Sequence, residues 1–318
     1  MRVLITGVAG FVGSHLAEIL IQKKQKIYGT CLACEPLDNI AHIKKKINLT
    51  ECDITDFDSL SKLIKRIKPD QIYHLAGFSS VGESFARPLT VVEINVRGTL
   101  YLLEILRNMK KKIKLLVVSS ADIYGKVKKS DLPIKETHNL NPVSPYGSSK
   151  ACADLLAYQY FHSYGVFAVR ARSFNHSGPR QSLGFVVPDF ASQVAKIDLG
   201  NSKPKMKVGD LSAKRDLSDV RDVVRAYYLL LKKGKPGEAY NICSGRAYKI
   251  DTLLNTLLRY SSRRITVEKK GKGRPSEIPV LLGDNAKMEK ELGWKPRISI
   301  QKTLKDTLDY WKDMYSRG

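Results

Sequence analysis

A tyrosine and a lysine four residues apart form the strongest candidate for chemistry in this chain of 318 residues. They are Tyr146 and Lys150, and residues at this spacing lie on one face of an α-helix. A free phenol has a pKa of about 10 and a lysine ammonium one of about 10.4. Because a cation beside the phenol favours phenolate, we expect Lys150 to lower the pKa of Tyr146. The pair therefore predicts proton transfer to or from a hydroxyl group of a substrate.

A second candidate lies at the end of an almost wholly apolar segment. Residues 114–119 read as a buried strand that closes with Ser119, and Ser120 follows it. Open α/β sheets bind their ligands in the crevice outside the carboxyl ends of their strands. We therefore expect Ser119 and Ser120 to lie at a ligand site.

Three glycines near the N-terminus have the spacing of a phosphate-binding turn. Gly7, Gly10 and Gly13 follow a predicted strand at 2–5 and precede a predicted helix at 14–22. Glycine permits a tight turn and a close approach of the backbone to a pyrophosphate, which then meets the amides of a helix N-terminus. Three glycines alone would also fit an ordinary strand-to-helix turn. The flanking strand and helix favour dinucleotide binding, with Phe11 and Val12 inside the turn.

The kind of dinucleotide depends on the end of the second predicted strand. A carboxylate there binds the ribose hydroxyls of NAD, whereas an arginine accepts the phosphate of NADP. Residues 28–32 read Tyr-Gly-Thr-Cys-Leu and contain neither. The absence of a repelling carboxylate modestly favours NADP(H), with NAD(H) as the alternative. At the end of the third strand, Asp53, followed by Ile54, is placed to bind the adenine amino group.

The first half of the chain alternates short apolar segments with amphipathic ones, which is typical of βαβ units around a parallel sheet. We predict strands at 2–5, 25–29, 48–52, 71–75, 114–119 and 167–172, and helices at 14–22, 59–67, 90–108 and 149–164. After about Phe174 the regularity weakens, with further helices at 220–231, 251–260 and 304–314.

This pattern predicts an α/β fold, a Rossmann-type doubly wound parallel sheet with a smaller C-terminal substrate-binding α/β segment. Residues 1–174 would form the dinucleotide-binding domain. Residues 175–318 would mainly bind the substrate, with some segments returning to the first domain.

The chain is strongly basic, with a formal net charge of +23. Its lysine clusters are scattered, at 44–46, 110–112, 232–235 and 269–272, without interleaved aromatic residues. A solvated surface that attracts anionic substrates explains them better than nucleic-acid or membrane binding does. We expect neither of these partners.

The five cysteines form no dense framework, which favours a reducing cytoplasm. Cys31 and Cys34 have the spacing of half a metal site, but no second pair or histidine cluster completes it. We therefore expect no metal. The N-terminus lacks the features of a signal peptide, and no segment has the roughly 18 apolar residues of a membrane span.

Together these motifs resemble the extended short-chain dehydrogenase/reductases that act on nucleotide sugars. The resemblance rests on Thr6-Gly7-x-x-Gly10-Phe11-x-Gly13, His74-Leu75-Ala76, Asn95-x-x-Gly98-Thr99, Ser119-Ser120-Ala121-Asp122-Ile123-Tyr124-Gly125 and the tyrosine-lysine pair. It implies that Ser120 is the hydroxyl partner, that Tyr146 is the acid or base, and that Lys150 also binds the nicotinamide ribose. It further implies cofactor contacts at Thr30, Leu75, Ala76, Gly77, Asn95 and Asn175.

The C-terminal half resembles the branch of this family that handles GDP-mannose derivatives. The similar segments are 172–179, 184–191, 208–216 and 274–277. The resemblance implies that Arg215 and Arg274 hold the diphosphate and that Glu277 binds the guanosine. Arginine forks bind phosphate oxygens in pairs, which agrees with this role. Further implied substrate contacts are Ser80, Ser120, Asp122, Asn175 and Val187. In this branch an arginine often lies where this chain has Leu32.

Reduction of a 4-keto-6-deoxy GDP-mannose to GDP-D-rhamnose is the expected reaction. A 4,6-dehydratase needs extra acid and base groups, and family dehydratases have a polar residue and then a glutamate after the serine or threonine of this strand end. Here those places hold Ala121, which transfers no proton, and Asp122, which reaches one methylene less far. Dehydratase and epimerase remain the alternative enzymes, and a non-catalytic dinucleotide-sensing protein is the alternative class. Helices 90–108 and 151–164 resemble the pair through which the family dimerises.

Overall fold

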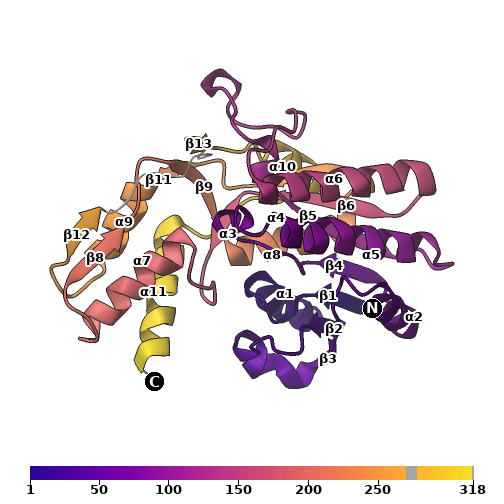
Figure 1. The fold of residues 1–318 in the computed structure, drawn as a ribbon, viewed down its shortest axis with the longest axis horizontal. Helices are drawn as coiled ribbons and strands as arrows, with labels where there is room; N and C mark the ends of the chain where they lie inside the picture. The colour runs from indigo at the N-terminus through magenta and orange to yellow at the C-terminus, as the bar shows by residue number, and fades with distance from the viewer. Residues whose placement is uncertain (270–277, 317–318) are drawn as a thin grey trace.

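A seven-stranded parallel sheet is the centre of the computed structural model, which describes residues 1–269 and 278–316 (Figure 1). The strand order is β10-β6-β5-β4-β1-β2-β3, and each neighbouring pair is parallel. The strands are β1 (Arg2–Thr6), β2 (Lys26–Cys31), β3 (Ile47–Glu51), β4 (Gln71–His74), β5 (Lys114–Ser120), β6 (Ala168–Ser173) and β10 (Ala239–Ile242). The predicted Rossmann-type sheet is confirmed.

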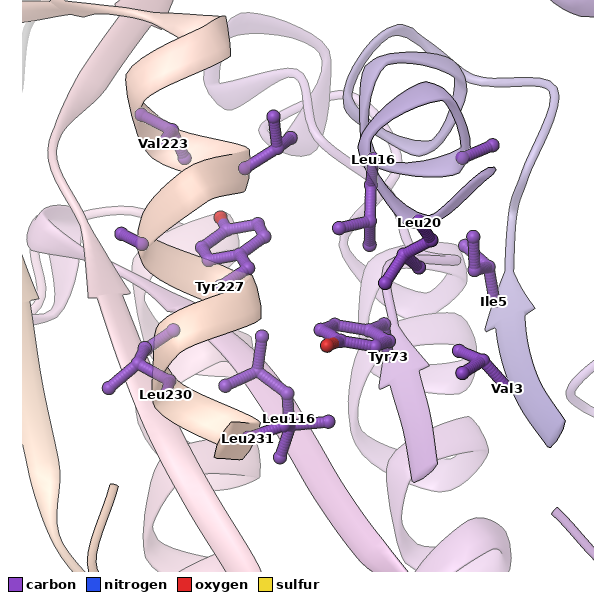
Figure 2. Packing of buried hydrophobic residues seen from close by; sticks show 14 of the residues in the cluster. Val3, Ile5, Leu16, Leu20, Tyr73, Leu116, Val223, Tyr227, Leu230 and Leu231 are labelled. Atoms are coloured by element: carbon purple, nitrogen blue, oxygen red, sulfur yellow. The ribbon is translucent and has the colours of Figure 1, made fainter. Parts of the chain in front are cut away.

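Helices cover both faces of this sheet because its central strands are apolar on both sides. One face packs against α1 (Phe11–Gln22) and α8 (Val220–Lys233), and Figure 2 shows Leu16 of α1 and Tyr227 of α8 pointing into this layer. The other face packs against α2 (Phe57–Ile67), α5 (Gly98–Arg107) and α6 (Pro145–Tyr164). The sheet is therefore wound on two sides, as predicted.

The helix predicted at 90–108 is not continuous. It consists of α4 (Pro88–Val92), a π-helical turn at Glu93–Arg97 and then α5. The wider turn carries Asn95, whose side chain is buried and bonded to a loop beside the sheet. The π-helical turn places the Asn95 side chain inside the protein and interrupts the regular period of the helix.

The second half of the chain builds a smaller unit beside the sheet (Figure 1). Its helices are α7 (Val186–Asp198), α9 (Ile250–Arg259) and α11 (Ile300–Ser316), whereas α10 (Ala286–Leu292) packs against α8 and β10. Its short strands are β7 (Asn175–Ser177), β8 (Lys205–Val208), β9 (Lys214–Asp219), β11 (Ala247–Lys249), β12 (Thr266–Lys269) and β13 (Val280–Leu281). The sequence predicted neither α7, α10 nor any of these strands.

Three segments of the second half lie with the first. Helix α8 covers the sheet, α10 packs beside α8, and β10 extends the edge of the sheet by pairing with β6. Across the described ranges, no helix combines the length and the apolar character that a membrane crossing requires.

Candidate active site

A cleft of about 1420 Å³ lies between the carboxyl ends of the sheet strands and the smaller unit. Nearly all the described residues that the sequence nominated line it. They are Gly7, Gly10, Phe11, Val12, Gly13, Thr30, Asp53, Ile54, Leu75, Ala76, Gly77, Ser80, Ser120, Asp122, Tyr146, Lys150, Asn175, Val187 and Arg215. The strand ends and α6 thus bring together residues from distant parts of the chain.

Three nominated residues need separate mention. Asn95 is absent from the lining of the cleft: its amide donates to the Phe78 carbonyl at 3.1 Å and to Ser149 Oγ at 2.9 Å. Its Oδ1 also accepts the Phe78 amide at 2.8 Å, so Asn95 holds the loop that lines the cleft. Arg274 and Glu277 lie outside the described residues.

The glycine-rich turn is as tight as a pyrophosphate site requires. A Cβ added to Gly13 would lie 2.2 Å from the Gly7 carbonyl oxygen, and one added to Gly29 would lie 2.4 Å from the Val8 side chain. Gly7 has a φ of +69°, a conformation that favours glycine. No side chain caps α1 at Gly10, which leaves the first amides of this helix for a ligand. The turn therefore fits a dinucleotide.

Tyr146, Ser120 and Asp122 form one hydrogen-bonded group. Ser120 Oγ donates to Asp122 Oδ2 at 3.0 Å and accepts the Asp122 amide at 3.2 Å. Ser120 also hydrogen-bonds to the phenol of Tyr146. Ser144 caps the helix that carries the tyrosine by accepting the Gly147 amide at 3.0 Å. The first turn of α6 is thereby fixed against the end of β5.

The pKa of Tyr146 departs from the expectation of a lowered value. Removal of the phenol from bulk water raises this pKa well above its usual range, and the nearby Asp122 carboxylate raises it further. The Ser120 hydrogen bond opposes these two effects without reversing them. The expected lowering by Lys150 is therefore wrong for the cofactor-free protein. Tyr146 keeps its proton at neutral pH and can act as a proton donor.

Lys150 lies on the same face of α6, with its ammonium directed to the sheet. Its Nζ donates to the Val118 carbonyl at 2.9 Å. A Cβ added to Gly77 would lie 3.7 Å from this nitrogen, so the ammonium borders the glycine-containing loop after β4. Burial lowers the pKa of Lys150 to about 8.

This value predicts a pH dependence for dinucleotide binding. Because the pKa of Lys150 is about 8, the side chain is mostly charged at pH 7 and mostly neutral at pH 9, and it attracts the anionic dinucleotide less at the higher pH. Affinity should fall several-fold between pH 7 and pH 9, as measured by fluorescence titration. Lys150→Met should bind more weakly and show a flatter profile; an equally steep fall in this variant would assign the titration to another group.

Arg215 is anchored at the wall of the cleft. Its Nη1 donates to the carbonyls of Ile278, at 2.6 Å, and Lys214, at 3.0 Å. The neighbouring Asp216 is buried and accepts the amides of Ser244, Gly245 and Gly283, which holds β9 against two loops. The guanidinium therefore has a defined position for an anion.

Sequence reasoning missed several residues of the cleft. His176 lines it from β7, Arg180 from the loop that follows β7, and Tyr310, Trp311 and Met314 from α11. His176 stacks on Phe11 of the glycine-rich turn, with ring centroids 6.0 Å apart. The hydrophobic periodicity of the sequence predicted the helix that carries Trp311. The same periodicity does not indicate that this helix faces the cleft.

Known proteins match the chain over nearly its whole length. The family model for GDP-mannose 4,6 dehydratase matches residues 4–307. A GDP-6-deoxy-D-mannose reductase from Pseudomonas aeruginosa is 35% identical over 98% of this chain and 97% of its own. A GDP-mannose 4,6 dehydratase from Cricetulus griseus is 30% identical over 95% of this chain and 89% of its own. The solved structure of RMD from Pseudomonas aeruginosa, complexed with NADPH, has a TM-score of 0.84 and 33% identity and covers 98% of this chain and 99% of its own.

Proposed function

Because this chain belongs to the GDP-mannose 4,6 dehydratase family, we propose that it reduces the 4-keto group of a GDP-linked 4-keto-6-deoxyhexose. The likeness to the Pseudomonas reductase supports GDP-4-keto-6-deoxy-D-mannose as the substrate and GDP-D-rhamnose as the product. The protein is an oxidoreductase of the short-chain dehydrogenase/reductase type that uses a nicotinamide dinucleotide. The NADPH in the solved relative agrees with the sequence-based preference for NADP(H).

The observation that carries this proposal is the pairing of Asp122 with Ser120. A dehydratase must remove a proton at carbon five and protonate the hydroxyl that leaves carbon six. In this chain the Asp122 carboxylate accepts the Ser120 hydroxyl at 3.0 Å, and Ala121 has no group that transfers a proton. The Asp122 carboxylate is thereby engaged with the hydroxyl at the carbonyl end of the site, which supports reduction over dehydration.

The chain's own residues supply what a ketone reduction requires. When bound, a reduced nicotinamide dinucleotide would supply a hydride to carbon four. Tyr146, whose raised pKa keeps it protonated, donates a proton to the oxygen on that carbon. The Ser120 hydroxyl would turn from Asp122 to the same oxygen and donate a hydrogen bond to it as negative charge develops there. Lys150, on the same helix as Tyr146, would hold the nicotinamide ribose.

The substrate would lie across the wall formed by the smaller unit. Arg215, held at the cleft by two backbone carbonyls, would bind the diphosphate, with Arg274 as its partner. Glu277 would bind the guanosine. Ser80, Asn175 and Val187, which line the same cleft, complete the proposed substrate contacts.

GDP-mannose 4,6-dehydratase is the second candidate, favoured by the carboxylate of Asp122 and by the relatives of that name. Incubation with the 4-keto-6-deoxy GDP-sugar should consume one reduced dinucleotide for each sugar, as followed by absorbance and product mass. Incubation with GDP-mannose is the matched control and should form no 4-keto sugar. Steady formation of that product without net consumption of dinucleotide would replace the reductase with the dehydratase.

A homodimer is also part of the proposal. Helices α4 and α6 present exposed apolar side chains, with Leu89 84%, Leu155 53% and Tyr158 45% exposed. Such side chains on neighbouring helices are typical of a protein interface. The protein used for the assay should therefore sediment with twice the mass of one chain.

A further inference from the structure

We infer that Glu35 makes this cleft bind NADH more tightly than NADPH, which reverses the modest preference for NADP(H) that residues 28–32 alone indicate. The inference rests on the proposed use of a nicotinamide dinucleotide and concerns the choice between its two forms. Glu35 lies outside residues 28–32, where the sequence pattern places the group that distinguishes NAD from NADP.

A tight turn returns Glu35 to the end of β2. The strand ends at Cys31, and the Glu35 amide donates to the Leu32 carbonyl at 3.2 Å. In the opposite direction, the Leu32 amide donates to Glu35 Oε2 at 3.1 Å. The half-buried carboxylate thereby lines the cleft at the strand end, where an acidic residue binds the adenosine ribose in dinucleotide-binding folds. Residues 28–32 contain no carboxylate, but the folded turn supplies one.

The charge on this side of the cleft is negative, although the chain as a whole carries +23. Glu35, Asp38 and Asp53 line the cleft, and no lysine or arginine does so among the described residues up to Ile54. The pKa of the Cys31 thiol agrees with this negative charge. Burial raises the pKa, Glu35 and Glu51 raise it further, and Lys44 lowers it by a smaller amount.

Among the described residues, the guanidinium that approaches this region from the second half of the chain is Arg180, and it is already paired. Arg180 lines the cleft, and its two terminal nitrogens donate to the two carboxylate oxygens of Glu18, each at 2.8 Å. It also donates to the Asn39 carbonyl at 3.2 Å. Its charge is therefore compensated by Glu18 rather than left for a phosphate.

The two cofactors differ at this point by one phosphate. NADPH carries a 2′-phosphate with roughly two negative charges, which carboxylates repel. NADH has a 2′-hydroxyl there, which donates a hydrogen bond to a carboxylate. Glu35 therefore favours NADH both by attraction and by exclusion. The solved relative is complexed with NADPH, so this fold can accept the 2′-phosphate. We therefore attribute the preference for NADH to the turn that contains Glu35.

Binding of each cofactor to the whole protein tests the inference without any sugar substrate. Fluorescence titration at one ionic strength should give a dissociation constant for NADH at least about tenfold below that for NADPH. In Glu35→Gln, whose amide oxygen still accepts the Leu32 amide, the ratio should fall at least about threefold. Glu289→Gln is the matched control: Glu289 is exposed on α10, pairs with Lys295 and does not line the cleft, so the ratio should stay unchanged.

Equal or tighter binding of NADPH by the natural protein would overturn the inference, as would an unchanged ratio in Glu35→Gln. Either result would be compatible with the proposed reductase activity. Failure to bind either dinucleotide would instead remove the proposed function, so the two failures are distinguishable.

Discussion

Tyr146→Phe should lower kcat for keto-sugar reduction at least about a hundredfold, the usual scale of positioned proton transfer. The substitution removes only the phenolic oxygen, which hydrogen-bonds to Ser120 and remains protonated at neutral pH. Phenylalanine keeps the ring and leaves the contact between Ser120 and Asp122 in place. The loss should therefore appear in kcat, with the dissociation constant of the dinucleotide changed by less than about threefold. Steady-state kinetics and fluorescence titration measure the two effects.

A second tyrosine of the same helix provides the control. Tyr164 is 47% exposed, and the Arg107 guanidinium lies over its ring, 4.1 Å from the centroid. Tyr164→Phe keeps this ring contact, so its kcat should match that of the natural protein. Near-normal turnover in Tyr146→Phe would show that another group delivers the proton.

Asp154→Ala should lower the free energy of unfolding by about 3–5 kcal/mol, the cost of removing one partner from a buried ion pair. Asp154 lies on α6 and has no exposed surface. Its carboxylate accepts Arg170 Nη1 at 2.7 Å, and Arg172 Nε and Nη2 at 3.0 and 2.9 Å. Without this carboxylate, two guanidiniums stay buried beside each other and lose the anion that compensates them. Urea denaturation with a common slope gives the difference.

The control is an aspartate with an exposed side chain. Asp313 lies on the exposed part of α11, and Asp313→Ala should change the free energy of unfolding by less than about 0.5 kcal/mol. A loss below about 1 kcal/mol in Asp154→Ala would mean that the two arginines find other partners or reach water. Because α6 carries both Tyr146 and Lys150, a partly unfolded variant should also bind dinucleotide poorly.

The sequence by itself determined the parts of this protein that depend on neighbouring residues. The glycine-rich turn is readable because its glycines, strand and helix are contiguous. Tyr146 and Lys150 share a helix face because they are four residues apart. The parallel sheet is readable because short apolar segments alternate with amphipathic ones. Each of these features follows from local backbone geometry or from a hydrophobic period, which needs no knowledge of distant contacts.

Only the tertiary structure decided what depends on contacts between distant segments. The raised pKa of Tyr146 comes from burial and from Asp122, which lies 24 positions earlier in the chain. The position of β10 beside β6, and of α11 at the cleft, depends on packing partners far away in the sequence. Even Glu35, only four residues after Cys31, faces the cleft because one turn reverses the chain. Desolvation, long-range packing and the direction of a turn are properties of the folded chain, so residue spacing leaves them undetermined.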